Sequence, residues 1–157
     1  MTKARQNHPS HSLAWILIVL ISSSYAIFAA AGDLDTSFNS DGVLTRSFGS
    51  QFEQIRGSAV QSDGKIIVVG RGANYFSVVR YNADGILDTS FDEDGKVITI
   101  FALTPPATTP DIANAVAVQS DGKIIVVGSA RMGLNNDDFA IVRYNSDGSL
   151  DTTFDTD

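Results

Sequence analysis

The sequence contains no cysteine and only two histidines, His8 and His11, which both lie near its start. The single tryptophan, Trp15, lies there too, so residues 32–157 have no Cys, His or Trp. Ser-His-Asp and Cys-His catalysis need an imidazole, and ordinary zinc, haem and iron–sulfur sites need Cys or His ligands. From residue 32 onward, these chemistries and disulfide bonds are excluded, and only oxygen ligands, hydroxyls and lysines remain.

Basic residues are also few for a chain of this length. Eleven Lys and Arg face 18 Asp and Glu, which gives a net charge of -7 over 157 residues. An acidic surface repels phosphate backbones, so we expect no nucleic-acid partner. The hydrophobic fraction of 43% is ordinary for a folded domain rather than for a disordered chain.

The first 31 residues differ from the rest of the chain. A polar start with two basic residues leads to the apolar run Leu13–Ile21 and then to small residues ending at Ala31. This order is typical of a helical secretory signal peptide, so we predict residues 1–31 as a signal peptide cleaved after Ala31. The expected location is secreted or at the cell surface, and the remaining nine basic and 18 acidic residues give a net charge of -9. An uncleaved membrane anchor is the alternative, because 19 residues just reach a spanning length.

A twelve-residue stretch, AVQSDGKIIVVG, occurs at Ala59–Gly70 and again at Ala117–Gly128, 58 positions later. The pieces LDTSF and RYN followed by DG recur around it. Aligning these pieces divides the chain into one repeat at residues 32–84, a second at 85–147 and the start of a third at 148–157. Such self-similarity indicates a repeat architecture.

Each repeat is predicted to contain four short antiparallel strands, because runs rich in β-branched and aromatic residues alternate with turn residues. In the first repeat these are Val43–Phe48, Ile55–Gln61, Lys65–Gly70 and Phe76–Tyr81. The unbroken IIVV in the third run predicts a strand buried on both faces.

Asp-Gly pairs link the second and third predicted strands of each repeat. Asp63 and Gly64 in the first repeat, and Asp121 and Gly122 in the second, are predicted as structural turns, since such a pair supplies the positive backbone angles of a tight hairpin. The fold is therefore predicted to be all-β, with tandem four-stranded units of the size of a propeller blade. A β-sandwich and a β-solenoid are the alternatives.

Together, LDTSF, the AVQSDGKIIVVG hairpin and the RYN motif resemble the delta-60 repeat of secreted bacterial proteins. The resemblance implies a β-propeller-like domain without an established activity. A propeller closes with roughly four to eight blades, whereas this chain has two units and a fraction. We therefore expect an incomplete propeller, as a fragment of a larger one or part of an assembly, with exposed sheet edges that allow self-association.

The two repeats differ in length at two places that fall at one end of the predicted sheets. Five extra residues enter within Ala102–Asn114 and five within Ser129–Asp138, whereas the Asp-Gly hairpin is unchanged. We call this end the variable rim. Loop variation on one rim often marks a binding side, here for a protein or glycan, although surface loops also tolerate insertions without any ligand. Its candidate binding residues are Thr104, Asp111, Arg131, Asn135, Asn136, Asp137 and Asp138.

Acidic residues gather at the opposite end. Asp88, Asp92 and Asp94 offer oxygens at a spacing that partly resembles a calcium loop, but Ser90 stands at the first ligand position and the final Glu is missing. The favoured interpretation is turn formation by side-chain hydrogen bonds, with Asp88 and its equivalents Asp35 and Asp151 capping a short turn.

Three further groups recur at equivalent positions of the repeats. Arg80 and Arg143 are expected either to pair with an Asp of the neighbouring turn or to lie exposed, and Tyr81 and Tyr144 to pack on the other face. The Leu and Phe residues of the LDTSF-type motifs are expected to anchor their turns in the core. These are Leu34, Leu87, Leu150, Phe38, Phe91 and Phe154.

The sequence thus predicts a secreted, non-enzymatic scaffold or binding module without a catalytic residue or cofactor. A propeller enzyme, such as a calcium-dependent lactonase or lyase, is one alternative. A calcium-stabilised surface adhesin is the other.

Overall fold

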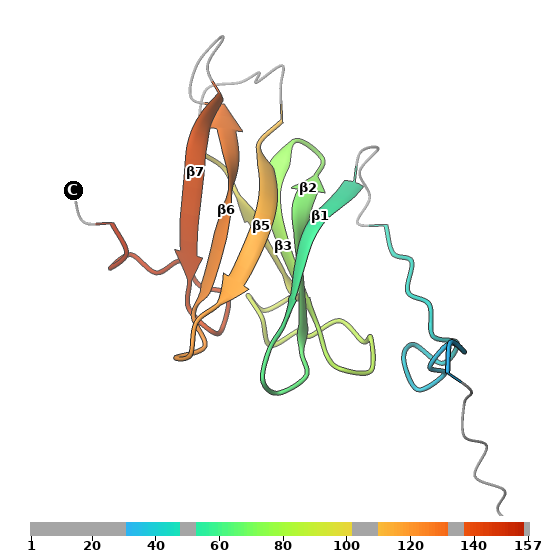
Figure 1. The fold of residues 1–157 in the computed structure, drawn as a ribbon. Coiled ribbons are helices and arrows are strands. Elements are labelled where there is room, and N and C mark those ends of the chain that lie inside the picture. Colours follow the sequence, from blue (N-terminus) through green and yellow to red (C-terminus); the bar gives the residue numbers. More distant parts are fainter. Residues whose placement is uncertain (1–30, 48–52, 102–109, 132–136, 156–157) are drawn as a thin grey trace, which may run out of the picture.

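The computed structural model describes residues 31–47, 53–101, 110–131 and 137–155. Within them, seven strands form two antiparallel sheets (Figure 1). The predicted signal peptide lies outside the described residues, apart from Ala31. Among the residues that are described, no helix has the length and apolar character needed to cross a membrane. The first sheet consists, in order, of β1 (Glu53–Val60), β2 (Ile66–Gly72), β3 (Tyr75–Tyr81) and β4 (Lys96–Thr99), and the second of β5 (Ile112–Val118), β6 (Ile124–Arg131) and β7 (Asp137–Tyr144).

The all-β prediction is confirmed, but one predicted strand is wrong. Residues 43–47 lie in no strand, and Phe48 lies outside the described residues. The first sheet takes its fourth strand instead from β4, which pairs with β3 between Phe76↔Thr99 and Val79↔Lys96. β4 has the strand that precedes it in the chain as a hydrogen-bonding partner, whereas turns precede Val43. The first sheet therefore extends past the sequence division at residue 85, because its outer strand β4 comes from the following repeat.

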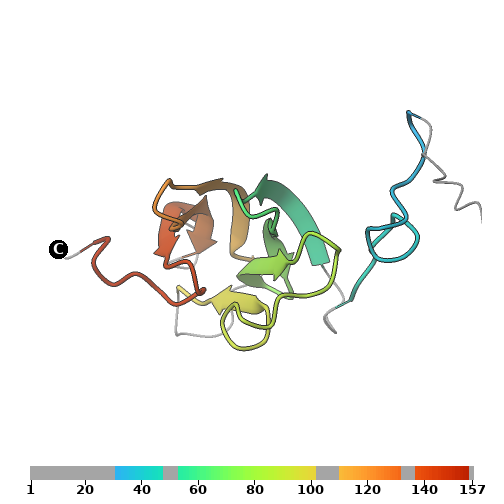
Figure 2. The same ribbon diagram turned by 90° about the horizontal axis from the view of Figure 1, so that it is seen from below.

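The two sheets pack face to face, as Figures 1 and 2 show from two directions. Phe76 occupies the centre of this interface, with its ring 5.4 Å from that of Phe101 in an edge-to-face arrangement. A Cβ atom at Gly128 would lie 2.8 Å from the Phe76 ring, so the glycine leaves the room that the ring needs. The core is formed chiefly by Ile67, Val69, Phe76 and Val78 of the first sheet and Ile124, Val126, Val142 and Tyr144 of the second.

The two central strands are not buried on both faces, so this part of the prediction is wrong for the described chain. In β2, Ile67 and Val69 are 0% and 2% exposed, whereas Val68 between them is only half-buried. In β6, Val127 is 37% exposed. Each sheet packs against its neighbour through one face, and the other face keeps apolar residues at the surface.

One type of five-residue turn occurs four times among the described residues. In the first copy the Gln61 N–H donates to the Lys65 carbonyl, the Gly64 N–H donates to the Gln61 carbonyl, and Asp63 Oδ1 accepts from the Lys65 N–H. Only Gly64 has a positive φ, of 84°, so Asp63 contributes a side-chain acceptor and not the second positive angle that we predicted. The other three copies span residues 82–86, 119–123 and 145–149.

Candidate functional site

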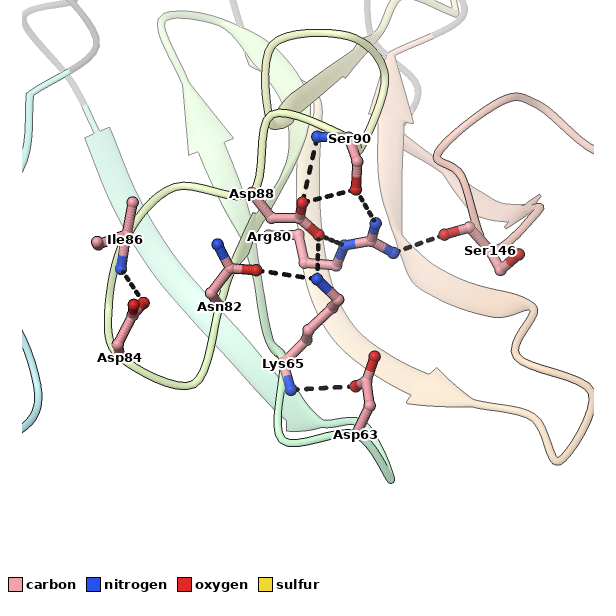
Figure 3. Close-up of polar contacts among 9 residues, drawn as sticks. All are labelled: Asp63, Lys65, Arg80, Asn82, Asp84, Ile86, Asp88, Ser90 and Ser146. Atoms are coloured by element: carbon pink, nitrogen blue, oxygen red, sulfur yellow. Dashed lines mark hydrogen bonds and ion pairs between the residues drawn. The ribbon is translucent and has the colours of Figure 1, made fainter.

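The most elaborate polar site lies where the β2 start, the β3 end and the LDTSF turn meet (Figure 3). Asp88 Oδ2 lies 2.7 Å from Arg80 Nε and 2.9 Å from Lys65 Nζ. Lys65 Nζ also donates to Asn82 Oδ1 at 2.9 Å, and Asp88 Oδ1 accepts from the Ser90 N–H and Oγ–H at 3.1 and 2.6 Å. These five residues form what we call the Asp88 cluster.

The local fold explains why such polar groups converge. Strand alternation places Arg80 on the same inward face of β3 as Val78 and Phe76. Arg80 and Asp88 are each only 5% exposed, and charges at this depth need a partner because desolvation is costly. The Arg80 guanidinium also lies over the Phe91 ring, 4.5 Å from its centroid, which adds a favourable cation–π contact.

The electrostatics hold the Asp88 carboxylate in its charged form. Burial opposes ionisation, but the hydrogen bonds from Ser90 and Lys65 and the charge of Arg80 outweigh it and hold the pKa of Asp88 well below its usual range. A general acid works best with a pKa near the operating pH. Asp88 is therefore suited to a permanent ion pair and not to proton transfer near neutrality.

An equivalent site, the Asp151 cluster, occurs in the second sheet. Asp151 Oδ2 lies 2.7 Å from Lys123 Nζ and 2.6 Å from Arg143 Nε, and Asp151 Oδ1 accepts from the Thr153 N–H and Oγ1–H. Lys123 Nζ donates to Asn145 Oδ1 at 3.1 Å. The hydrogen bonds from Lys123 and Thr153, together with that from Arg143, lower the pKa of Asp151.

The third equivalent residue, Asp35, has the turn but not the cations. Its Oδ1 accepts from the Ser37 N–H and Oγ–H at 2.9 and 2.6 Å, as in the other two turns. Among the described residues, no Lys or Arg forms an ion pair with Asp35, which is exposed. The turn therefore forms without its ion pair.

The Asp88 cluster also connects the two sheets. Arg80 Nη1 donates to the Ser146 carbonyl at 2.5 Å, and the Asp92 N–H donates to the Asp147 carbonyl at 2.8 Å. The Phe91 ring lies against Gly148, where an added Cβ would be 3.0 Å from it. The LDTSF turn of one sheet thus rests on the Asp-Gly turn that follows β7 of the next sheet.

Each of these two clusters lies within a segment that matches a known family. Residues 61–91 and 119–154 match the family described as "Domain of unknown function (DUF5122) beta-propeller". Both segments are DUF5122 matches. No curated protein matches the chain. The DUF5122 match supports a β-propeller domain, in agreement with the fold that the sequence predicted.

The calcium candidates of the first DUF5122 segment and its flank have separate structural roles. Both oxygens of Asp88 accept hydrogen bonds within its cluster, and Asp94 Oδ1 accepts from the Lys96 N–H at 2.9 Å. Burial raises the pKa of Asp92, as do the nearby charges of Asp94, Glu93 and Asp147. In the described part of the chain, no group of three or more Asp, Glu, His or Cys side chains is placed to hold a metal ion.

The structure brings three of the variable-rim residues together, Asp111 from between the two DUF5122 segments and Arg131 and Asp137 from within the second. Asp111 is buried, its N–H donates to the Asn74 carbonyl, and its Oδ1 accepts from the Arg131 N–H at 2.9 Å. Arg131 Nε donates to Asp137 Oδ1 at 2.8 Å. These contacts fix the bases of the loops. Asp138 is exposed, whereas Thr104, Asn135 and Asn136 lie outside the described residues.

The prediction that the Leu and Phe residues of the LDTSF-type motifs anchor their turns in the core is only partly correct. Phe91 is completely buried, but Leu34 and Leu150 are 60% and 56% exposed and Phe154 is 39% exposed, so these three do not anchor a core here. Leu87 and Phe38 are half-buried.

The predicted packing of the two tyrosines is confirmed. Tyr81 and Tyr144 are both buried. The Tyr144 hydroxyl lies 2.5 Å from Thr99 Oγ1, and burial raises the pKa of Tyr144 to about 12.

Sequence reasoning paired Arg80 with an Asp of the neighbouring turn but missed Lys65 and Asn82 as partners. A signal for both was present. Lys65 recurs as Lys123 within the repeated hairpin, and Asn82 recurs as Asn145 at the end of the RYN motif.

Proposed function

We propose that this protein is a secreted, non-enzymatic scaffold or binding module of the β-propeller type. The observation that supports it is duplication: the Asp88 and Asp151 clusters place the same residue types in the same ion pairs. An active site usually gathers unlike catalytic groups around one reacting atom. Here the charged groups hold a turn in both clusters, and in the Asp88 cluster they also connect the two sheets, which is a structural role.

The proposed export rests on residues 1–31, whose basic start, apolar middle and small-residue end are typical of a signal peptide. The proposed binding side is the variable rim, because its two loops differ in length between repeats whose opposite ends are alike. A protein or glycan is the expected class of ligand.

A hydrolase screen tests the absence of catalysis. We expect the purified chain to show no turnover of esterase, lactonase or glycosidase substrates above the rate in buffer. Turnover that copurifies with the chain and is lost on substitution of one exposed polar residue would contradict the proposal.

A glycan array tests the binding side. We expect any bound glycan to be lost from a variant with Asn135, Asn136 and Asp138 all changed to Ala. The matched control changes Ser62 and Ser120 to Ala at the opposite ends of the sheets and should bind normally. Loss in the control alone would place binding on the other rim.

Calcium separates this proposal from the adhesin and from the calcium-dependent enzyme. A scaffold held by Lys and Arg ion pairs should melt at the same temperature with calcium and with a chelator. A midpoint that rises on addition of calcium and falls on chelation would favour the alternatives, since a ligand that binds the folded state stabilises it.

A further inference from the structure

The interface between the two sheets is built from two unlike faces. The first sheet contributes one face of β2 and β3, centred on Phe76, and the second contributes one face of β6 and β7, centred on Gly128. Each sheet also has an outer face that does not take part in this interface. In the described chain, each sheet therefore has one face buried in the interface and one face turned outward.

By repeat position, the residues of each outer face are equivalent to those of the buried face of the other sheet. On the first sheet, the outer Ile66, Val68 and Tyr81 hold the repeat positions of the buried Ile124, Val126 and Tyr144. The outer face of the second sheet repeats the buried face of the first in the same way. Its residues Ile125, Val127, Phe139 and Ile141 hold the positions of Ile67, Val69, Phe76 and Val78.

These outer faces are apolar and leave several large side chains accessible, whereas Tyr81 on the first one is 7% exposed. Phe139 is 100% exposed and Ile141 57% exposed on the second sheet, and Ile55 is 71% exposed on the first. The outer face of the first sheet also forms a groove of about 570 Å³ whose lining includes Ile55, Val68 and Tyr81. Contiguous exposed apolar surface marks an interaction site, and the IIVV run is typical of a strand covered on both faces.

We propose that a second copy of this chain covers the groove, with the outer face of its second sheet docked on the outer face of the first sheet. The internal interface is the template for this head-to-tail contact. Phe76 fits against Gly128 inside the chain, so Phe139 of one copy would fit against Gly70 of the next. The two glycines have the same surroundings: an added Cβ would lie 1.8 Å from the Gln54 carbonyl oxygen at Gly70 and 1.9 Å from that of Ile112 at Gly128.

The segment that borders the groove is compatible with this docking. Leu44, Thr45 and Arg46 line one side of the groove and hold the repeat positions of β4. In the described chain, the second sheet has three strands and no equivalent of β4. The segment therefore lies where the docked sheet has no strand of its own.

Because the two faces are unlike, the contact is heterologous. Such contacts produce a ring if the rotation between copies closes and an open filament if it does not. With two sheets in each copy, a ring of roughly four to eight blades would need about two to four copies.

Sedimentation velocity of the purified full chain at increasing concentration tests the proposal, together with two variants that each lose one face. Phe139→Asp removes the docking face and Ile55→Asp the receiving face, and both residues are too exposed to support the fold. We expect the unmodified chain to associate, each variant alone to stay monomeric, and an equimolar mixture of the two to form a dimer that does not grow. The control Ser120→Asp, at a hairpin tip, should associate like the unmodified chain.

Circular dichroism of each variant checks that it is folded, and Phe139→Ser and Ile55→Ser replace any that is not. A monomeric unmodified chain at every concentration, variants that associate normally, or a mixture that stays monomeric would each overturn the proposal. The proposal goes beyond the scaffold function and fails separately from it. Substrate turnover would contradict the scaffold without affecting association, and a monomeric chain would leave the absence of catalysis untouched.

Discussion

Three of the buried charged side chains that the structure describes, Arg80, Asp88 and Asp151, form ion pairs, whereas Asp111 accepts a hydrogen bond from the Arg131 backbone N–H. A buried ion pair adds little net stability over apolar residues of the same volume, but removing one partner leaves an uncompensated charge in the interior. Asp88 has two such partners, Arg80 and Lys65, whose side chains are 6% and 27% exposed. Its removal should therefore matter far more than the removal of an exposed carboxylate.

We predict that Asp88→Asn lowers the free energy of unfolding by about 3 kcal/mol, because Arg80 loses the charge that compensates its burial. The measurement is the midpoint of urea unfolding. Asp35→Asn is the matched control, since Asp35 forms the same turn without an ion pair to Lys or Arg in the described chain. Equal losses in the two variants would show that the turn, and not the ion pair, carries the effect.

The same carboxylate predicts how stability depends on acid. The pKa of Asp88 lies below its ordinary value in the folded chain, so its contribution to stability is present above about pH 4 and is lost as the pH falls further. The difference in unfolding free energy between the unmodified chain and Asp88→Asn should therefore be constant near neutrality and shrink below about pH 4. A difference that grows on acidification would contradict the lowered pKa.

At the scale of turns and strands, the sequence predicts best what is local. The Asp-Gly hairpins and the strands that flank them follow from residue type and alternation, and β1, β2 and β3 lie where these predict them. The fourth strand could not be located in this way. Residues 43–47 and β4 occupy the same repeat position, but only β4 has a preceding strand to pair with, and pairing is decided by neighbours in space.

The local part of the Asp88 cluster could be predicted from the sequence, whereas its long-range part could not. Arg80 and Asp88 are eight residues apart on one continuous segment, so their pairing could be inferred. Lys65 is 23 residues from Asp88 and reaches it only because β2 and β3 are adjacent in the sheet. The deeper burial of Arg80, whose side chain is 6% exposed against 21% for the equivalent Arg143, depends on the second sheet, which no local pattern encodes.

Two of the Asp-Gly turns, at Gly122 and Gly148, allow the contact between repeats to be tested by substitution. Gly122 and Gly148 have φ values of 84° and 95°, so Ala at either position should cost about 1–2 kcal/mol in backbone strain. At Gly148 an added Cβ would also lie 3.0 Å from the Phe91 ring, whereas at Gly122 its nearest neighbour is 3.5 Å away. Gly148→Ala should therefore destabilise the chain more than Gly122→Ala in urea unfolding. Equal effects would mean that the contact with Phe91 contributes nothing.

At the scale of the whole molecule, stability depends on one sheet covering the next. Repeat units that cannot bury their apolar faces alone gain stability from their neighbours. Phe76 and Phe139 show this most directly, because they hold the same repeat position but are 0% and 100% exposed.

We predict that Phe76→Ala lowers the free energy of unfolding by about 3–5 kcal/mol, since it leaves a cavity between the sheets. Phe139→Ala, measured at low protein concentration, should have little effect. Urea unfolding of both variants tests this pair. A similar loss for both would mean that the outer face of the second sheet is already covered under those conditions.

The Asp88 and Asp151 clusters, and the hydrogen bonds that Arg80 and Asp92 donate to the turn after β7, lie at one end of the sheets, opposite Arg131 and Asp137 at the variable rim. A foreign peptide inserted between Arg131 and Asp137 would therefore be displayed far from the Asp88 and Asp151 clusters, with the ion pair between Arg131 and Asp137 at its base. Each doubling of the length of a flexible loop costs only about 0.6 kcal/mol in closure entropy. The chain is thus suited to peptide grafting, with a turn-rich base that would need no redesign from one insert to the next.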